Sequence, residues 1–239
     1  MLPHNVTFYS PNFSTYKRTQ KNIKYLILHY TGMKSESQAI NRLTNCNSKV
    51  SCHYFIKKNG KIILMVPDRY IAWHAGKSKW KKINSLNKYS IGIEIHNGGH
   101  KFNYPNFTKK QILSVIKLCK NLKKKYKIKK QNILGHSDIS YNRKNDPGEK
   151  FPWKLMSKHQ ISIWHNLKTN KLLNMRKKNT SKFEKNQFFN NLNKFGYKKQ
   201  GKNNNKLLVI AFQRRFRNQL INGIIDLECL TISKKLCNM

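Results

Sequence analysis

The stretch "YLILHYTG" at residues 25–32 decides the fold. Its apolar run from Tyr25 to Tyr30 is followed directly by Thr31-Gly32, a pattern typical of a buried strand that ends at a loop. The polar exception is His29, near the end of the run. Because strand ends are rigid, a side chain held there suits a site that needs geometric precision. We therefore predict a buried strand that carries a candidate functional residue at its end.

Further strands and a helix follow this first strand. Residues 35–43 predict a helix, with Ala39, Ile40 and Leu43 on one side. The segment "CHYFIKKNGKIILMV" at 52–66 predicts two strands joined by Asn59-Gly60, a pair that favours a type I′ turn with positive φ at both residues. The segment "SIGIEIH" at 90–96 predicts another strand, in which isoleucines alternate with other residues.

A long helix is predicted from Thr108 to Tyr126, with Thr108 as its N-cap and an apolar stripe at helical spacing. "NILGH" at 132–136 then predicts a short strand that leads into the loop "SDISYNRKNDPGEKFPW" at 137–153. Strands that alternate with helices predict an α/β domain over residues 1–156, with a central mixed β-sheet flanked by helices.

The rest of the chain has a different pattern. Residues 157–180 predict a helical, basic connector. Residues 181–239 predict a small C-terminal three-helix bundle, near the lower size limit for independent folding. Its three amphipathic segments are "FEKNQFFNNLNKFGY" at 183–197, "NNNKLLVIAFQRRF" at 203–216 and "DLECLTISKKL" at 226–236.

The charge of the chain is strongly positive, with 49 Lys and Arg against nine Asp and Glu, a formal net charge of +40. Lysine spread through the whole composition is one explanation, and attraction to a polyanion such as nucleic acid or an anionic cell wall is the other. No zinc-finger spacing, RNA-recognition motif or basic heptad region is present, so we expect no specific nucleic-acid partner. Acids are so scarce that Glu94, Asp138 and Asp146, each in a motif-like segment, are informative.

The five cysteines are odd in number and contain no CxxC pair, so we expect free thiols rather than a disulfide framework. The short spacing of Cys46 and Cys52 leaves one bridge open. No apolar stretch reaches the roughly 18 residues of a membrane span, and we expect no transmembrane segment. The N-terminal segment has no apolar core typical of a signal peptide, which favours a cytoplasmic location.

Three residues at element ends form a candidate metal site: His29, His136 after "NILG", and Asp146 in the following loop. Two imidazoles and a carboxylate suit one catalytic Zn²⁺ ion with a fourth position left for water, whose pKa falls from 15.7 toward about 7. Glu94, in a strand of isoleucines, could serve as general acid and base, and Lys144 could stabilise an oxyanion. The alternatives are a structural histidine, a turn-forming Asp146 and a Glu94 paired with a lysine, and spacing alone does not choose between them.

Four segments, in this order, closely resemble the type-2 N-acetylmuramoyl-L-alanine amidases, a family related to the peptidoglycan recognition proteins. They are "LILHYTG" at 26–32, "VSCHYFIKKNGKIILMVPDRYIAWHAG" at 50–76, "YSIGIEIHN" at 89–97 and "ILGHSDISYNRKNDPG" at 133–148. The resemblance covers roughly residues 22–156. It implies zinc-dependent hydrolysis of the amide bond between N-acetylmuramoyl, or its 1,6-anhydro form, and L-alanine, in peptidoglycan or muropeptides, for cell-wall turnover or recycling.

The resemblance also implies roles for particular residues. It implies one Zn²⁺ held by His29, His136 and Asp146, with Glu94 as acid and base and Lys144 as stabiliser of the transition state. The segment with Trp73 and His74 lines the substrate cleft of the family, which makes both residues candidates for substrate binding. Asp146 is similar to the third ligand of the bacterial amidases, where phage and animal relatives have Cys.

The chain departs from its relatives at residues 140–142, which read Ser-Tyr-Asn where relatives often read Ala-Pro-Gly. This loop carries Lys144 and Asp146, so the sequence leaves the source of its rigidity open. The C-terminal segment resembles the three-helix peptidoglycan-binding module often appended to such amidases. Its arginines, Arg214, Arg215 and Arg217, would meet anionic wall groups or form a solvated face, and its apolar helix stripe would alternatively pack on the catalytic domain.

Two functional questions stay open at this point. A non-catalytic peptidoglycan-binding protein is the alternative to the amidase, although the presence of all three ligands, Glu94 and Lys144 favours catalysis. The missing export signal favours recycling in the cytoplasm, whereas the C-terminal module favours the periplasm or cell envelope. We expect a monomer.

Overall fold

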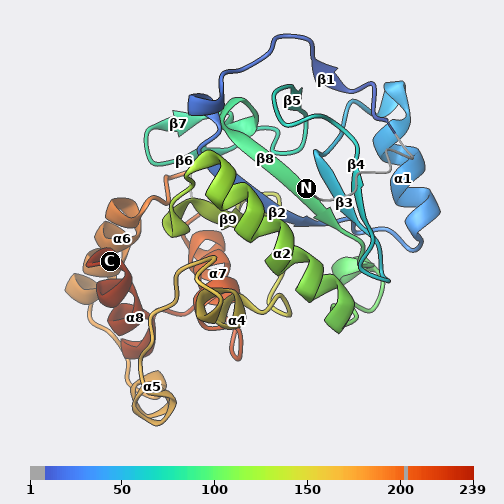
Figure 1. Ribbon diagram of the computed structural model, residues 1–239. Helices are drawn as coiled ribbons and strands as arrows, with labels where there is room; N and C mark the ends of the chain where they lie inside the picture. Colours follow the sequence, from blue (N-terminus) through green and yellow to red (C-terminus); the bar gives the residue numbers. More distant parts are fainter. Residues whose placement is uncertain (1–8, 202–203) are drawn as a thin grey trace.

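The computed structural model describes residues 9–201 and 204–239. A five-stranded sheet in the order β4-β3-β8-β2-β9 forms its centre (Figure 1). β2 is parallel to β8 and to β9, and β3 is parallel to β8, whereas β4 is an antiparallel edge. The predicted mixed sheet is therefore confirmed. Its strands are β2 (Tyr25–Tyr30), β3 (Tyr54–Ile56), β4 (Ile62–Leu64), β8 (Ser90–Ile95) and β9 (Ile133–Gly135).

Two helices of the α/β unit, α2 and α1, were predicted from the sequence. α2 (Lys109–Tyr126) lies across the sheet (Figure 1) and begins with a capping box, in which the Thr108 side chain accepts from Gln111 N. α1 (Glu36–Thr44) is capped by Ser35 and buries Ala39, Ile40 and Leu43 in a second apolar cluster beside β3 and β4. The two helices thus bury their apolar faces in different clusters of the core.

The connection between β3 and β4 differs from the predicted type I′ turn. Gly60 has a φ of 86°, but Asn59 has no positive φ, and the Gly60 N–H donates to Lys57 O at 2.9 Å. Lys57 N also donates to Lys61 O, so the loop has three residues rather than two. A loop of this length uses an ordinary turn followed by one left-handed residue, and Gly60 takes that place.

Shorter elements complete the α/β unit. Two small ladders pair β1 (Phe13–Ser14) with β5 (Ile71–Ala72) and β6 (Lys79–Trp80) with β7 (Ile83–Asn84). Two short helices, α3 (His136–Ile139) and α4 (Trp153–Lys158), follow β9. The 3₁₀ turns are η1 (Gln20–Asn22), η2 (Cys46–Ser48), η3 (Leu86–Tyr89), η4 (Gly99–Lys101) and η5 (Lys130–Asn132).

The C-terminal part contains the three predicted helices, α6 (Lys182–Phe195), α7 (Asn205–Phe216) and α8 (Leu227–Cys237). Within the expected connector, only the end of α4 and α5 (Thr169–Arg176) are helical, and α4 crosses residue 156. α6 packs on α8, whereas α7 lies against α3 of the α/β unit. Apolar side chains of the sheet, α2, α6, α7 and α8 belong to one continuous core, so α7 joins the two parts of the chain.

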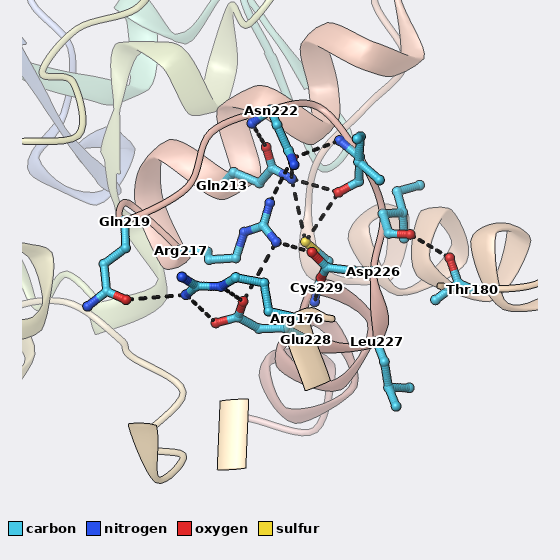
Figure 2. A network of polar contacts seen from close by, with 12 residues as sticks. Arg176, Thr180, Gln213, Arg217, Gln219, Asn222, Asp226, Leu227, Glu228 and Cys229 are labelled. Atoms are coloured by element: carbon cyan, nitrogen blue, oxygen red, sulfur yellow. Dashed lines mark hydrogen bonds and ion pairs between the residues drawn. The ribbon is translucent and has the colours of Figure 1, made fainter. Parts of the chain in front are cut away.

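The arginines of α7 occupy neither of the environments predicted for them. Arg214, Arg215 and Arg217 are at most 8% exposed. Arg217 pairs with Asp226 and Glu228 inside the C-terminal part (Figure 2). Since every residue from 211 to 216 is buried, this end of the helix is enclosed on all sides and has no solvated face.

Two expectations about the whole chain can be compared with the structure. All five cysteines are free thiols, so the bridge left open between Cys46 and Cys52 is not formed. Within residues 9–201 and 204–239, none of the helices combines the length and the apolar character that crossing a bilayer requires.

Candidate metal centre

Two parallel strands bring the two candidate histidines together. His29 is the fifth of six residues in β2, and His136 is the first residue of α3, directly after β9. The sequence predicted a strand that ends with His136, whereas in the structure the strand ends one residue earlier, at Gly135. Because β2 and β9 are parallel neighbours, their carboxyl ends meet at one edge of the sheet. Asp146 returns to this edge from the following loop, where its carbonyl accepts from Ser137 N at 2.8 Å.

The three side chains converge on one point. Nδ1 of His29 lies 2.9 Å from Nδ1 of His136, and each nitrogen lies 3.0 Å from Oδ2 of Asp146. All three residues are buried, and the group could hold a metal ion. Ligands about 2.0–2.1 Å from a shared tetrahedral ion would be roughly 3.3 Å apart, close to the separations observed.

A chain of hydrogen bonds assigns the tautomer of His29. The Ser90 hydroxyl donates to Leu86 O at 2.8 Å, so its oxygen accepts from His74 Nε2, 3.1 Å away. His74 Nδ1 is then the unprotonated nitrogen and accepts from His29 Nε2 at 3.1 Å. The remaining nitrogen of His29, Nδ1, therefore points its lone pair at the shared point.

Other contacts leave His136 Nδ1 and the Asp146 carboxylate unprotonated as well. His136 Nε2 donates to Ala75 O at 3.2 Å, which leaves Nδ1 unprotonated. Burial disfavours the charged form of Asp146, but the two histidines beside it outweigh that effect and lower the pKa of Asp146. Burial and then the neighbouring His136 lower the pKa of His29 to about 4.

The protonation states of His29, His136 and Asp146 decide whether a metal ion fits between them. Three lone-pair donors lie within hydrogen-bond distance of one another, and no proton remains to be shared between them. Such a group is repulsive unless a cation lies at its centre. Two neutral imidazoles and a carboxylate, with their outer atoms fixed by His74 and Ala75, match the donor set and the surroundings that are typical of a catalytic metal site.

Glu94 lies on β8, paired in register with His29 of β2. Its Oε2 is buried and has no hydrogen-bond partner among the described residues. Burial, followed by the charge of Asp146, raises the pKa of Glu94 well above its ordinary value, whereas Lys144 lowers it. A carboxylate oxygen without a hydrogen-bond partner at the edge of the candidate metal site can exchange a proton with a reactant.

His136 and Asp146 line a cleft of about 580 Å³. Glu94, Lys144, Trp73 and His74 all contribute to its wall. His74 Nδ1 lies 3.1 Å from His29 Nε2, and a Cβ atom at position 92 would lie 2.3 Å from the His74 ring, so Gly92 leaves the space for it. Trp73 is half-buried, and its Nε1 donates to Ser14 Oγ at 3.2 Å. The substrate-binding roles of both residues stay predictions.

Sequence reasoning missed the residues that hold the candidate ligands in place. Ser90 and Leu86 precede the "IGIEI" segment and resemble ordinary strand and turn residues. Arg143, one of many basic residues, donates to the carbonyls of Ala75 and Lys77 and ties the ligand loop to the segment beside it. Among the residues that support the candidate ligands, the sequence marked Asp138, because acids are scarce in this chain.

Comparisons with known proteins agree with this geometry. A family model described as N-acetylmuramoyl-L-alanine amidase matches residues 19–149. N-acetylmuramoyl-L-alanine amidase AmiD of Escherichia coli is 33% identical over 230 residues, which cover 90% of this chain and 82% of that protein. 1,6-Anhydro-N-acetylmuramyl-L-alanine amidase AmpD of Haemophilus influenzae is 40% identical over 107 residues, 44% of this chain and 56% of that protein.

Two solved structures are similar over nearly the whole chain. The complex of E. coli AmiD with the substrate anhydro-N-acetylmuramic acid-L-Ala-D-gamma-Glu-L-Lys has a TM-score of 0.81 at 29% identity, covering 94% of this chain and 92% of that one. AmpDh3 from Pseudomonas aeruginosa has a TM-score of 0.78 at 28% identity, covering 99% of this chain and 98% of that one. The similarity thus extends beyond the α/β unit into the C-terminal helices.

Proposed function

The chain belongs to the N-acetylmuramoyl-L-alanine amidase family, and from this premise we propose that it cleaves its amide bond with one Zn²⁺ ion held by His29, His136 and Asp146. The chain is a hydrolase of the bond between N-acetylmuramoyl and L-alanine. The observation that carries the metal proposal is the convergence of three unprotonated donor atoms within 3.0 Å of one another.

The donor set favours zinc among the common metal ions. Imidazole nitrogens with a single carboxylate are typical zinc ligands, whereas Ca²⁺ and Mg²⁺ prefer oxygen. When bound, zinc supplies a nucleophile from water at neutral pH and polarises the carbonyl of the scissile amide. Three protein ligands and a cleft on the open side leave room for both reactants.

Glu94 is the residue that moves the proton in this proposal. Its Oε2 has no protein partner and lies at the wall of the cleft, so it can accept the proton of the attacking water. The raised pKa lets the carboxyl group retain that proton until the tetrahedral intermediate breaks down. The proton then goes to the nitrogen of L-alanine, which leaves as a free amine.

Lys144 is proposed to stabilise the negative charge that develops on the carbonyl oxygen. It lies two residues before Asp146, lines the cleft and lowers the pKa of Glu94 through its charge. A cation held beside the reacting carbon is most effective where the cleft excludes water. Trp73, on the cleft wall, is proposed to contact the sugar or the stem peptide.

We propose anhydro-muropeptides as the substrate form. The AmiD structure that this chain resembles over 94% of its length contains an anhydro-N-acetylmuramic acid peptide, and the matched AmpD proteins carry the 1,6-anhydro substrate in their names. The cytoplasmic location expected from the sequence stays a prediction, which fractionation of the native host would test.

The test is hydrolysis of purified muropeptides by protein stripped of metal with a chelator and then reloaded. We expect release of free stem peptide only after zinc is restored, with one equivalent of metal bound. Parallel assays on anhydro-muropeptides and on intact sacculi would separate the two substrate forms. Full activity in the stripped protein would refute the metal proposal, and muropeptide binding without cleavage would favour a recognition protein.

A further inference from the structure

The loop from His136 to Glu149 carries two of the three candidate ligands and Lys144, and the C-terminal part of the chain contacts it at several points. Beyond the four-residue helix α3, this loop has no regular secondary structure of its own. Its middle, residues 140–142, reads Ser-Tyr-Asn and contains no proline that would stiffen it. Its position must therefore come from the residues that contact it.

The first contact is at Asp138, two residues after His136. Its side chain is 1% exposed and accepts from Gly135 N at 2.7 Å, which fixes the start of α3. The Tyr197 hydroxyl donates to Asp138 Oδ1 at 2.5 Å, and Arg215 of α7 pairs with Oδ2. Arg215 also donates to Ile133 O of β9 at 3.0 Å. One arginine thus holds both the strand and the helix that meet at His136.

The second contact is in the middle of the loop. The hydroxyl of Tyr141 accepts from the backbone N–H of Gln200 at 2.7 Å. The side chain of Gln200 donates in turn to Ile139 O at 2.9 Å. Tyr141 and Gln200 are both buried, so these are interior bonds rather than surface contacts.

The third contact is at Glu149, three residues after Asp146. Arg214 Nε lies 3.4 Å from Glu149 Oε2, and Asn218 donates to Glu149 O at 2.9 Å. The C-terminal part therefore holds the ligand loop at its start, middle and end. Arg215 at the start of the loop, and Arg214 and Asn218 at its end, all lie in or just after the last turn of α7.

We infer that Arg215 and Tyr197 are positioning residues of the metal centre, so that the C-terminal part is a structural component of the active site. This inference rests on the proposed metal function. Ligand atoms must stay within about 0.5 Å of their productive positions, and a loop with so little regular secondary structure needs contacts from neighbouring segments to keep that precision. Arg215 and Tyr197 supply it through Asp138 by fixing the turn from which His136 projects.

Arg217 offers a matched control for Arg215. Both are buried arginines near the end of α7, 3% and 2% exposed, and both are paired with buried carboxylates. The partners of Arg217, however, are Asp226 and Glu228, which belong to the C-terminal part itself (Figure 2). Loss of either arginine leaves an uncompensated buried carboxylate, but only loss of Arg215 releases the ligand loop.

The experiment compares the full-length variants Arg215→Met and Arg217→Met, each loaded with Co²⁺ as a spectroscopic probe and titrated with a competing chelator. We expect Arg215→Met to bind metal roughly tenfold more weakly, with an altered Co²⁺ absorption spectrum, and Arg217→Met to stay within about twofold of the unmodified chain. Both variants should melt at lower temperature, since both lose a buried ion pair.

Tyr197→Phe is the second variant, in case Arg215→Met does not fold, because it removes only one hydroxyl from Asp138. It should show a smaller loss of metal affinity in the same direction, and a lower kcat with an unchanged KM. Equal metal affinities and spectra in all folded variants would overturn the inference alone. No metal binding by the unmodified chain would instead overturn the proposed function.

Discussion

The parallel strands β2, β3 and β8 have buried polar clusters at both ends, and the two clusters differ in how completely they are paired. At the amino ends, Arg18 donates to the carbonyls of Asp68, Asn87 and Ser90. The carboxylate of Asp68 accepts from two tyrosine hydroxyls at 2.6 Å and from Lys125 at 2.9 Å. At the carboxyl ends, three donor atoms lack a shared proton and Glu94 Oε2 has no partner among the described residues.

The completeness of hydrogen bonding distinguishes a structural cluster from a functional one more clearly than the residue types do. Both clusters contain buried histidines, a carboxylate and an arginine or lysine nearby. Native proteins pair nearly all their buried polar groups, so a completely paired cluster needs only a structural explanation. A cluster with unpaired groups must gain its stability from something that the protein binds, here the proposed metal ion and substrate.

The largest expected effect is that of Glu94→Gln at the carboxyl ends. The amide keeps the shape of the side chain but cannot accept a proton, so kcat should fall by about 10²- to 10⁴-fold. Zinc content should be unchanged, and the free energy of unfolding should not decrease, because Oε2 has no protein partner to lose. Activity assays, metal analysis and urea unfolding of the same preparation would check this, and full activity would remove Glu94 from its role.

Asp68→Asn at the amino ends should have the opposite profile. The substitution removes the charged acceptor of two buried hydroxyls and of Lys125, which should lower the free energy of unfolding by about 2 kcal/mol. kcat/KM measured well below the melting temperature should be unchanged, because Asp68 lines no part of the cleft. A variant of normal stability and reduced activity would reverse the assignment of the two clusters.

The sequence predicted the parts of this arrangement that depend on local pattern. The strand at Tyr25–Tyr30, the helix after Thr108 and the choice of the candidate ligands followed from apolar periodicity, capping and motif resemblance. The partners of those ligands did not follow, because they depend on which distant segments meet. Nothing near Arg215 in sequence indicates Asp138, 77 residues away, and nothing near His74 indicates Ser90. For the same reason, arginines expected on the surface proved to be buried.

His74→Phe tests whether His74 holds the metal ligand or binds substrate. The phenyl ring keeps the ring shape beside Gly92 but leaves His29 Nε2 without its acceptor. Since loss of such an outer partner typically weakens metal binding, we expect about tenfold lower zinc affinity. At saturating zinc, KM should be close to normal. The substrate-binding prediction from the sequence requires instead a higher KM with unchanged zinc affinity, so chelator competition and steady-state kinetics together decide between them.

The smallest expected effect is a pH dependence of stability that arises at the amino ends. Burial, followed by the charge of Arg18, lowers the pKa of His53 to about 3. Asp68 and the Tyr70 carbonyl favour protonation of His53 but do not outweigh these two effects. The other titratable ring beside His53 is His74, whose centroid lies 5.6 Å away. The unfolded chain takes up this proton near pH 6.5, before the folded chain does, so this contribution to stability is complete above pH 6.5 and is lost as the pH falls toward 3. Between pH 7 and 5.5 the loss should be about 1 kcal/mol.

Urea unfolding of the native chain and of His53→Gln, in the same metal state at both pH values, isolates this contribution of His53, because the variant lacks the titrating group. An equal pH dependence in both proteins would mean that His53 is not held neutral, and that the amino-end cluster is less completely paired than its hydrogen bonds indicate.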